Sequence, residues 1–135
     1  METNAMQVLG THHVALCTPN FEALRDFYTK TLGMVPIGSF SFRNIVYLAA
    51  GDITIELVER LEPPNVSRQG WVHLAFEVED VQKSYETLSA KGVPFHILPQ
   101  GFPEDSPVFK MAFFKDPDGN DIELVQPLID GYPQL

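Results

Sequence analysis

The chain has 135 residues, 44% of them hydrophobic and 20% charged, which is enough for one globular domain and argues against disorder. Nine basic against 18 acidic residues give a net charge of −9, and an acidic surface repels nucleic-acid phosphates and anionic membrane lipids. No apolar run approaches the roughly 20 residues that a transmembrane helix needs, and the single cysteine, Cys17, suits a reducing compartment, so we expect a soluble cytoplasmic protein whose partner is a small molecule.

The first half of the chain predicts a strand, a helix and three further strands, in that order. The first strand covers residues 10–17, and Asn20 is placed to cap a helix whose apolar side chains recur at helical spacing until Gly33. Gly51-Asp52 is a tight-turn signal between the last two strands. The three strands after the helix are expected at residues 34–38, 42–49 and 53–59.

The second half repeats this order. A strand at 71–78 is followed by a helix that Asp80 caps and Gly92 closes. Further strands are expected at 94–98, 108–115 and 121–126. Asn20 and Asp80 are 60 residues apart, and Gly33 and Gly92 are 59 apart, which indicates a duplication.

Two stretches interrupt this regular pattern. Residues 61–70, with two adjacent prolines, form the predicted linker between the halves, and residues 99–107, with three prolines, predict an irregular rim loop. The chain therefore predicts a single domain over residues 8–127, made of modules 8–61 and 70–127, with tails at 1–7 and 128–135.

Period-two alternation places two histidines and two glutamates on one face of the predicted sheets. His13 points away from the apolar side chains of the first strand, and Glu56 does so in the strand before the linker. His73 and Glu123 occupy the matching places in the second half. The duplication pairs them, because His13 and His73 are 60 residues apart and Glu56 and Glu123 are 67 apart.

Two imidazoles and two carboxylates on one concave face make a divalent-metal site. Such ligands suit Zn, Ni, Co, Mn or Fe, and four of them on an octahedral ion leave two positions for water or a bidentate substrate. A single outward His or Glu on a strand is ordinarily a solvated surface residue. The match of type and register in both halves favours one divalent metal ion bound by His13, Glu56, His73 and Glu123.

Four stretches resemble the vicinal oxygen chelate superfamily, which includes glyoxalase I, methylmalonyl-CoA epimerase, extradiol dioxygenases and the fosfomycin and bleomycin resistance proteins. They are HHVAL at 12–16, IEL at 55–57, HLAFEV at 73–78 and DPDGNDIEL at 116–124, and the resemblance extends from Val8 to Pro127. It implies an α+β fold in which two βαβββ modules form a curled mixed sheet around a cup, with the helices outside. The family's ligand positions fall on the four residues that alternation selects.

The residue at the Glu56 position distinguishes the activities within this family. Glyoxalase I has Glu there and the epimerase has Gln, whereas dioxygenases and fosfomycin-type transferases use a His, His, Glu set. By this resemblance we expect a metal-dependent lyase or isomerase of glyoxalase-I or epimerase type, with Glu123 as the base and Glu56 as its partner. The alternatives are an extradiol-type iron dioxygenase and a non-catalytic, bleomycin-resistance-like binding protein.

The resemblance to glyoxalase I breaks at two positions that concern glutathione. Cys17 stands where bacterial glyoxalase I has a glutathione-binding Arg, and Arg60 stands where Asn is common. We therefore expect glutathione recognition to be poor. With no activating partner evident in the sequence, Cys17 is expected to be a small buried hydrophobe.

Three further residues are candidates for substrate binding. Arg43 and Lys110 are 67 residues apart, as are Tyr47 and Phe114, and we expect Arg43, Tyr47 and Lys110 to face the cup and meet an anionic or planar substrate. Solvated basic residues and a core aromatic are the alternative interpretation.

A homodimer is expected, and the two modules of one chain could complete one cup alone or exchange between chains.

Overall fold

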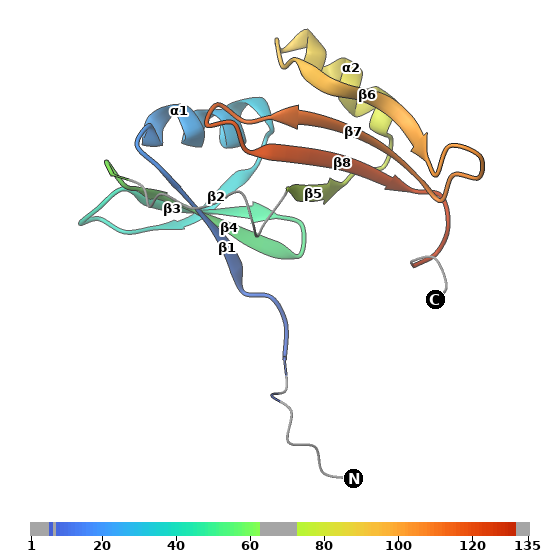
Figure 1. Ribbon diagram of the computed structural model, residues 1–135. Coiled ribbons are helices and arrows are strands. Elements are labelled where there is room, and N and C mark those ends of the chain that lie inside the picture. The colour runs from blue at the N-terminus through green and yellow to red at the C-terminus, as the bar shows by residue number, and fades with distance from the viewer. Residues whose placement is uncertain (1–5, 7, 63–72, 132–135) are drawn as a thin grey trace.

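The computed structural model describes residues 6, 8–62 and 73–131, which form two modules of the same topology (Figure 1). The first contains β1 (His13–Thr18), α1 (Phe21–Asp26), a π-helical turn η1 (Phe27–Thr31), β2 (Val35–Ser39), β3 (Ile45–Ala50) and β4 (Ile53–Glu59). The second contains β5 (Leu74–Glu77), α2 (Val81–Ala90), β6 (Phe95–Phe102), β7 (Phe109–Lys115) and β8 (Asp121–Pro127).

Each module builds its own four-stranded mixed sheet. The strand orders are β1-β4-β3-β2 and β5-β8-β7-β6. The first strand of each module pairs in parallel with the last, and the other neighbours are antiparallel. The identical orders confirm the α+β class and the two βαβββ modules. In the described residues, each module contributes one of two four-stranded mixed sheets.

Glycines at positive φ allow the two tight hairpins that bring these strands together. Gly51 (φ 68°) lies between β3 and β4, and Gly119 (φ 87°) lies between β7 and β8. A side chain on a residue in this left-handed region clashes with its own backbone, so glycine is the favoured residue there. The Gly51 turn lies where the sequence predicts it, and Gly119 lies in the gap between the strands predicted at 108–115 and 121–126.

The two helices begin in different ways. Asp80 caps α2 as predicted, because its side chain accepts a hydrogen bond of 3.0 Å from the Lys83 backbone N–H. Asn20 precedes α1 but its side chain makes no capping hydrogen bond, while the Thr18 hydroxyl accepts one from the Asn20 N–H. In the part of the chain that the structure describes, no helix is long and apolar enough to cross a membrane.

Several element boundaries differ from those expected. β6 extends to Phe102, so residues 99–102 lie in a strand and only the later part of the predicted rim loop is irregular. β3 begins at Ile45 rather than at Phe42. In the second module β5 begins at Leu74; residues 71 and 72, and most of the predicted linker, lie outside the described residues.

The two modules share one hydrophobic core and are also joined by polar contacts. Tyr28, which is fully buried, donates a 2.8 Å hydrogen bond to the Asp116 carboxylate in the β7–β8 turn. The same carboxyl group accepts hydrogen bonds from the backbone N–H groups of Asp118 and Asn120. The Asp116 carboxylate therefore stabilises the β7–β8 turn internally and also bonds it to the first module. In Figure 1 this turn lies beside α1. Core residues from both modules include Leu24, Leu48, Ile55, Leu57, Val81, Phe114 and Ile122.

Candidate metal centre

The first half-site consists of His13 on β1 and Glu56 on β4. These strands are parallel neighbours with Ala15 opposite Glu56, which brings the His13 Nε2 to 3.8 Å from the Glu56 carboxylate. The Nδ1 of the neighbouring His12 lies 2.9 Å from the His13 Nδ1. This contact occupies one ring nitrogen of His13 and leaves Nε2 facing the carboxylate, as an orienting partner of a metal-binding histidine does.

The second half-site consists of His73, directly before β5, and Glu123 on β8. Ala75 is opposite Glu123, and the His73 Nε2 lies 3.0 Å from the Glu123 carboxylate. Glu123 is buried, with 8% of its surface exposed. Burial raises the pKa of the Glu123 carboxyl above its ordinary value, and the charge and hydrogen bond of His73 only partly offset this effect.

An aromatic side chain accompanies each half-site. Tyr47 is opposite Glu56 across β3 and β4, and its ring centroid lies 6.1 Å from that of His13. Phe113 is opposite Glu123 across β7 and β8, and its centroid lies 5.2 Å from that of His73. The sequence offset of 67 had matched Tyr47 with Phe114, which is instead fully buried in the core. The register of β7 and β8, in which Phe113 lies opposite Glu123, identifies Phe113 as the counterpart of Tyr47.

Within one chain the two half-sites remain apart. The described residues contain no group of three or more His, Cys, Asp or Glu side chains that could hold a metal ion. The structure thus pairs His13 with Glu56 and His73 with Glu123, but does not bring all four together. In each pair an imidazole nitrogen and a carboxylate oxygen converge, so each pair offers two donors of the kind that borderline divalent metals prefer.

A second polar cluster lies beside the second half-site. The Nε2 of His96, which sequence reasoning left without a role, lies 3.7 Å from the Asp121 carboxylate. The Lys115 ammonium also pairs with Asp121 and holds the pKa of that carboxyl below its ordinary value. The Phe113 ring lies near both imidazoles, with its centroid 5.2 Å from that of His73 and 6.0 Å from that of His96. These residues extend the polar face of the second sheet beyond the half-site.

The three expected substrate-binding residues lie in different places. Tyr47 lies on the face of the first half-site, where a hydrogen bond to Glu56 raises the pKa of its phenol. Arg43 is exposed in the segment between β2 and β3. Lys110 lies on the same face of β7 as the buried Ala112 and Phe114. Glu123 is paired with Phe113, which lies on the other face, so Lys110 points away from Glu123. This corrects the expectation that Lys110 faces the cup.

Cys17 is exposed rather than buried, which corrects another expectation. Side chains alternate between the two faces of a strand, so Cys17 lies on the same face of β1 as His13 and Ala15. All three residues are exposed in this chain. The opposite phase carries the apolar Val14 and Leu16, which face the core side. Cys17 therefore lies on the same face as the first half-site.

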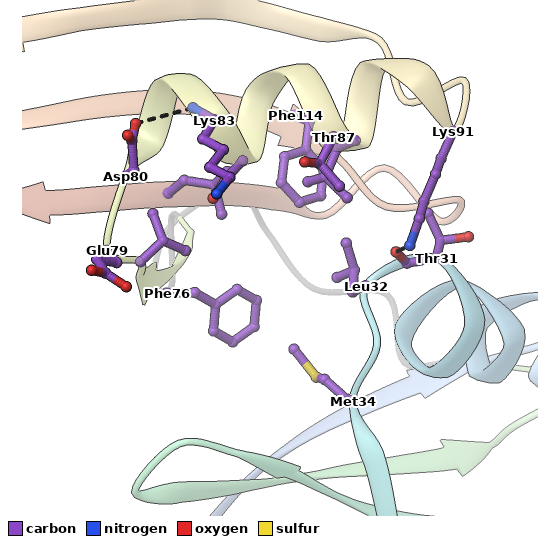
Figure 2. Close-up of a pocket in the computed structure, with 14 residues that line it drawn as sticks. Thr31, Leu32, Met34, Phe76, Glu79, Asp80, Lys83, Thr87, Lys91 and Phe114 are labelled. Atoms are coloured by element: carbon purple, nitrogen blue, oxygen red, sulfur yellow. Dashed lines mark hydrogen bonds between the residues drawn. The ribbon is translucent and has the colours of Figure 1, made fainter.

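A cavity of about 610 Å³ lies elsewhere, between α2, β5 and the segment that follows η1 (Figure 2). Phe76 and Met34 approach it from the two modules, and at one end the Lys91 ammonium donates a hydrogen bond to the Thr31 carbonyl. None of the four predicted ligands lines it. The cavity is a gap between modules on the helical side, on the other face of the sheets from the half-sites.

Comparisons with known proteins connect this geometry to one family. The family model for the glyoxalase/bleomycin resistance protein/dioxygenase superfamily matches residues 10–124. A lactoylglutathione lyase from Neisseria meningitidis is 28% identical over 123 residues, which are 84% of this chain and 88% of that protein. Biphenyl-2,3-diol 1,2-dioxygenase 2 from Rhodococcus globerulus is 30% identical over 127 residues, and the match covers 83% of this chain but only 60% of the dioxygenase.

A solved structure adds a third kind of protein. The antibiotic-binding protein TnmS3 from a Streptomyces species matches this fold with a TM-score of 0.69 at 25% identity, over 91% of this chain and 99% of that one. A lyase, a dioxygenase and a binding protein are thus similar to this chain at comparable identity, so similarity alone does not select an activity. The matched family model covers both modules and all four residues of the half-sites, and the chain belongs to the glyoxalase/bleomycin resistance protein/dioxygenase superfamily.

Proposed function

We propose that the protein is a metal-dependent lyase or isomerase of glyoxalase-I or epimerase type, which moves a proton on a carbon next to a carbonyl group. The observation that carries the proposal is the repetition of one half-site in both modules. Each half-site has an imidazole Nε2 facing a carboxylate, at 3.8 Å and 3.0 Å, on the matching pair of parallel strands. Two His–Glu pairs that were ordinary surface contacts would not be expected to match in residue type, strand position and side-chain orientation.

A complete ligand set in this proposal requires two copies of the chain. One half-site supplies two donors, and four donors are needed for the set of two imidazoles and two carboxylates that the sequence pattern indicates. The proposed homodimer places the His13–Glu56 half-site of one copy against the His73–Glu123 half-site of the other. The separation of the half-sites within one chain supports this arrangement.

The residues of the half-sites have distinct roles in the proposed reaction. When bound, a divalent ion supplies Lewis acidity to the carbonyl oxygen of the substrate. The buried Glu123 carboxylate accepts the proton from the neighbouring carbon as the general base. Glu123 then returns this proton to the adjacent carbon of the substrate, with Glu56 as its partner on the other half-site, and His13 and His73 would provide neutral nitrogen ligands.

One experiment tests the reaction class through Glu123. The Glu123→Gln variant and the wild type are loaded with Zn, Ni, Co or Mn and incubated in heavy water with 2-oxo acids, α-hydroxy ketones and acyl thioesters. We expect the wild type to incorporate deuterium beside the carbonyl of at least one substrate and the variant to do so at least 100-fold more slowly. Glu77→Gln, on the same face of the second sheet, is the matched control and keeps the wild-type rate.

Two results would contradict the proposal. Equal exchange rates for Glu123→Gln and the wild type would remove Glu123 from the reaction. Oxygen consumption that requires ferrous iron and a catechol, without proton exchange, would instead favour an extradiol-type dioxygenase, which the similarity to the Rhodococcus enzyme makes the second candidate.

A further inference from the structure

Four aromatic rings form a row that begins at the first half-site. The centroid of His13 lies 6.1 Å from that of Tyr47, Tyr47 lies 6.1 Å from Phe40, and Phe40 lies 5.3 Å from Phe42. All three contacts are edge-on or tilted, within the range in which aromatic pairs attract one another. The row therefore connects the His13–Glu56 half-site with the segment between β2 and β3.

The outer part of this aromatic row is uncovered. Phe40 is 45% exposed and Phe42 is 73% exposed. Gly38 is opposite Tyr47 on β2, and a Cβ at this position would lie 3.6 Å from the Tyr47 ring, so the glycine leaves the ring open on that side. Clustered exposed aromatic rings beside a polar site are a typical feature of surfaces that bind a ligand.

A guanidinium group stands at the end of the row. The Arg43 guanidinium carbon lies 5.6 Å from the Phe42 ring centroid, in cation–π contact. Arg25 stacks on Phe21 in the same way, at 5.7 Å, but it also pairs with Asp26. Among the residues that the structure describes, Arg43 has no such carboxylate partner. Arg43 is therefore available to an anionic group from outside the chain.

Resting on the function proposed above, we propose that the substrate is a carbonyl compound with a flat aromatic group and, beyond it, an anionic group. The carbonyl end lies at the half-sites, the aromatic group packs on Tyr47 and Phe40, and the anion binds Arg43. A three-carbon carbonyl compound would leave this row uncovered. A guanidinium is also the side chain best suited to a carboxylate or phosphate, and here it offsets the repulsion of anions by a chain with a net charge of −9.

Three 2-oxo acids with the same metal-chelating end, used as binding probes, test this substrate class. Pyruvate has no ring, benzoylformate has the ring, and 4-carboxybenzoylformate has the ring and a distal carboxylate. Titration calorimetry measures each probe against the metal-loaded protein and against the protein in EDTA. We expect benzoylformate to bind several-fold more tightly than pyruvate, and 4-carboxybenzoylformate to bind about tenfold more tightly than benzoylformate.

Matched variants show which side chains cause the two gains in binding affinity, one from the ring and one from the distal carboxylate. Arg43→Gln should remove the gain from the distal carboxylate and keep the gain from the ring, whereas Arg25→Gln, the other stacked arginine, should keep both. Phe40→Leu should reduce the gain from the ring. Equal binding of the three probes, or equal effects of the two arginine variants, would overturn the inference. So would a change in subunit number in Arg43→Gln by light scattering, since the row would then be a subunit contact.

The two proposals fail in different ways in this experiment. If pyruvate binds only in the presence of metal but the ring and the carboxylate add nothing, the metal site stands and the substrate class is wrong. If the ring and the distal carboxylate still increase the binding affinity while metal has no effect on any probe, the aromatic row binds the ligand and the proposed metal-dependent function is wrong.

Discussion

At the scale of single residues, the position of Cys17 has a direct consequence for thiol chemistry. It lies on the face of His13, where a cationic anchor for the carboxylates of glutathione would be needed. A charge-assisted pair at such a place contributes about 1.5–3 kcal/mol. Its absence predicts that the hemithioacetal of methylglyoxal and glutathione is a poor substrate.

This prediction is tested with a glyoxalase assay on the metal-loaded protein. We expect kcat/KM for the hemithioacetal to lie below about 10⁵ M⁻¹s⁻¹. Cys17→Arg should lower KM by about tenfold or more, while Cys17→Ser, which adds no charge, should leave it unchanged. Efficient turnover by the wild type would show that another residue anchors glutathione.

At the scale of elements, the two helices offer a comparison of capping. The Asp80 side chain caps α2 through the Lys83 N–H, whereas the Asn20 side chain makes no such bond at α1. We expect Asp80→Ala to lower the free energy of unfolding by about 1 kcal/mol and Asn20→Ala to lower it by much less. Urea denaturation followed by circular dichroism measures both values. Equal losses would mean that the side-chain cap contributes nothing.

The hydrogen bond between Tyr28 and Asp116 predicts how strongly η1 is bound to the β7–β8 turn. Tyr28→Phe should lower the free energy of unfolding by about 1.5–3 kcal/mol, because it removes a donor from a buried carboxyl group. Tyr85→Phe is the control, since the Tyr85 ring packs edge-on against Phe95 on the surface of α2. A similar loss in both variants would contradict this role.

The same tyrosine predicts a dependence of stability on alkaline pH. Burial, followed by the negative charge of Asp116, raises the pKa of the Tyr28 phenol far above its ordinary value of 10.0. Above pH 10 the unfolded chain therefore loses a proton that the folded chain retains. The wild type should lose about 1.4 kcal/mol of stability per pH unit there relative to Tyr28→Phe. Parallel stability curves for the two proteins between pH 9 and 11 would contradict this linkage.

At the scale of the whole molecule, the proposed homodimer predicts complementation between variants. His13→Ala destroys one half-site and His73→Ala destroys the other, so each variant alone should lose stoichiometric metal and activity. A mixed dimer has two shared sites: in one of them both half-sites are intact, and in the other both are altered. After unfolding and refolding together, the two variants should recover about a quarter of the wild-type activity and metal content.

The controls for complementation separate a shared site from a site within one chain. His96→Ala, on the second sheet but outside the half-sites, should keep full metal content by elemental analysis. No recovery in the mixture would place all four ligands in one chain. Full stoichiometric metal in a His13→Ala/His73→Ala double variant would remove these residues from the metal site altogether.

Much of the fold was predictable because it depends on local patterns. Period-two alternation, the capping residue Asp80 and the turn glycines Gly51 and Gly119 act within a few residues of the chain, so they predicted the elements, their order and the duplication. The same alternation placed His13, Glu56, His73 and Glu123 on one face of the predicted sheets, whereas the structure shows that each histidine lies beside the glutamate of its own module.

What the sequence could not decide depends on contacts between distant segments. The 88-residue separation of Tyr28 and Asp116 leaves no local signal for their hydrogen bond. The face of Lys110 depends on the phase of the buried positions in β7, and the exposure of Cys17 depends on what covers β1. The contact between Phe27 and Phe114, whose ring centroids lie 6.2 Å apart, likewise joins the two modules across a long stretch of chain. The sequence by itself determined that His13, Glu56, His73 and Glu123 lie on the polar faces of their sheets. Only the tertiary structure decided which of these residues meet, because packing between modules arises from side chains far apart along the chain.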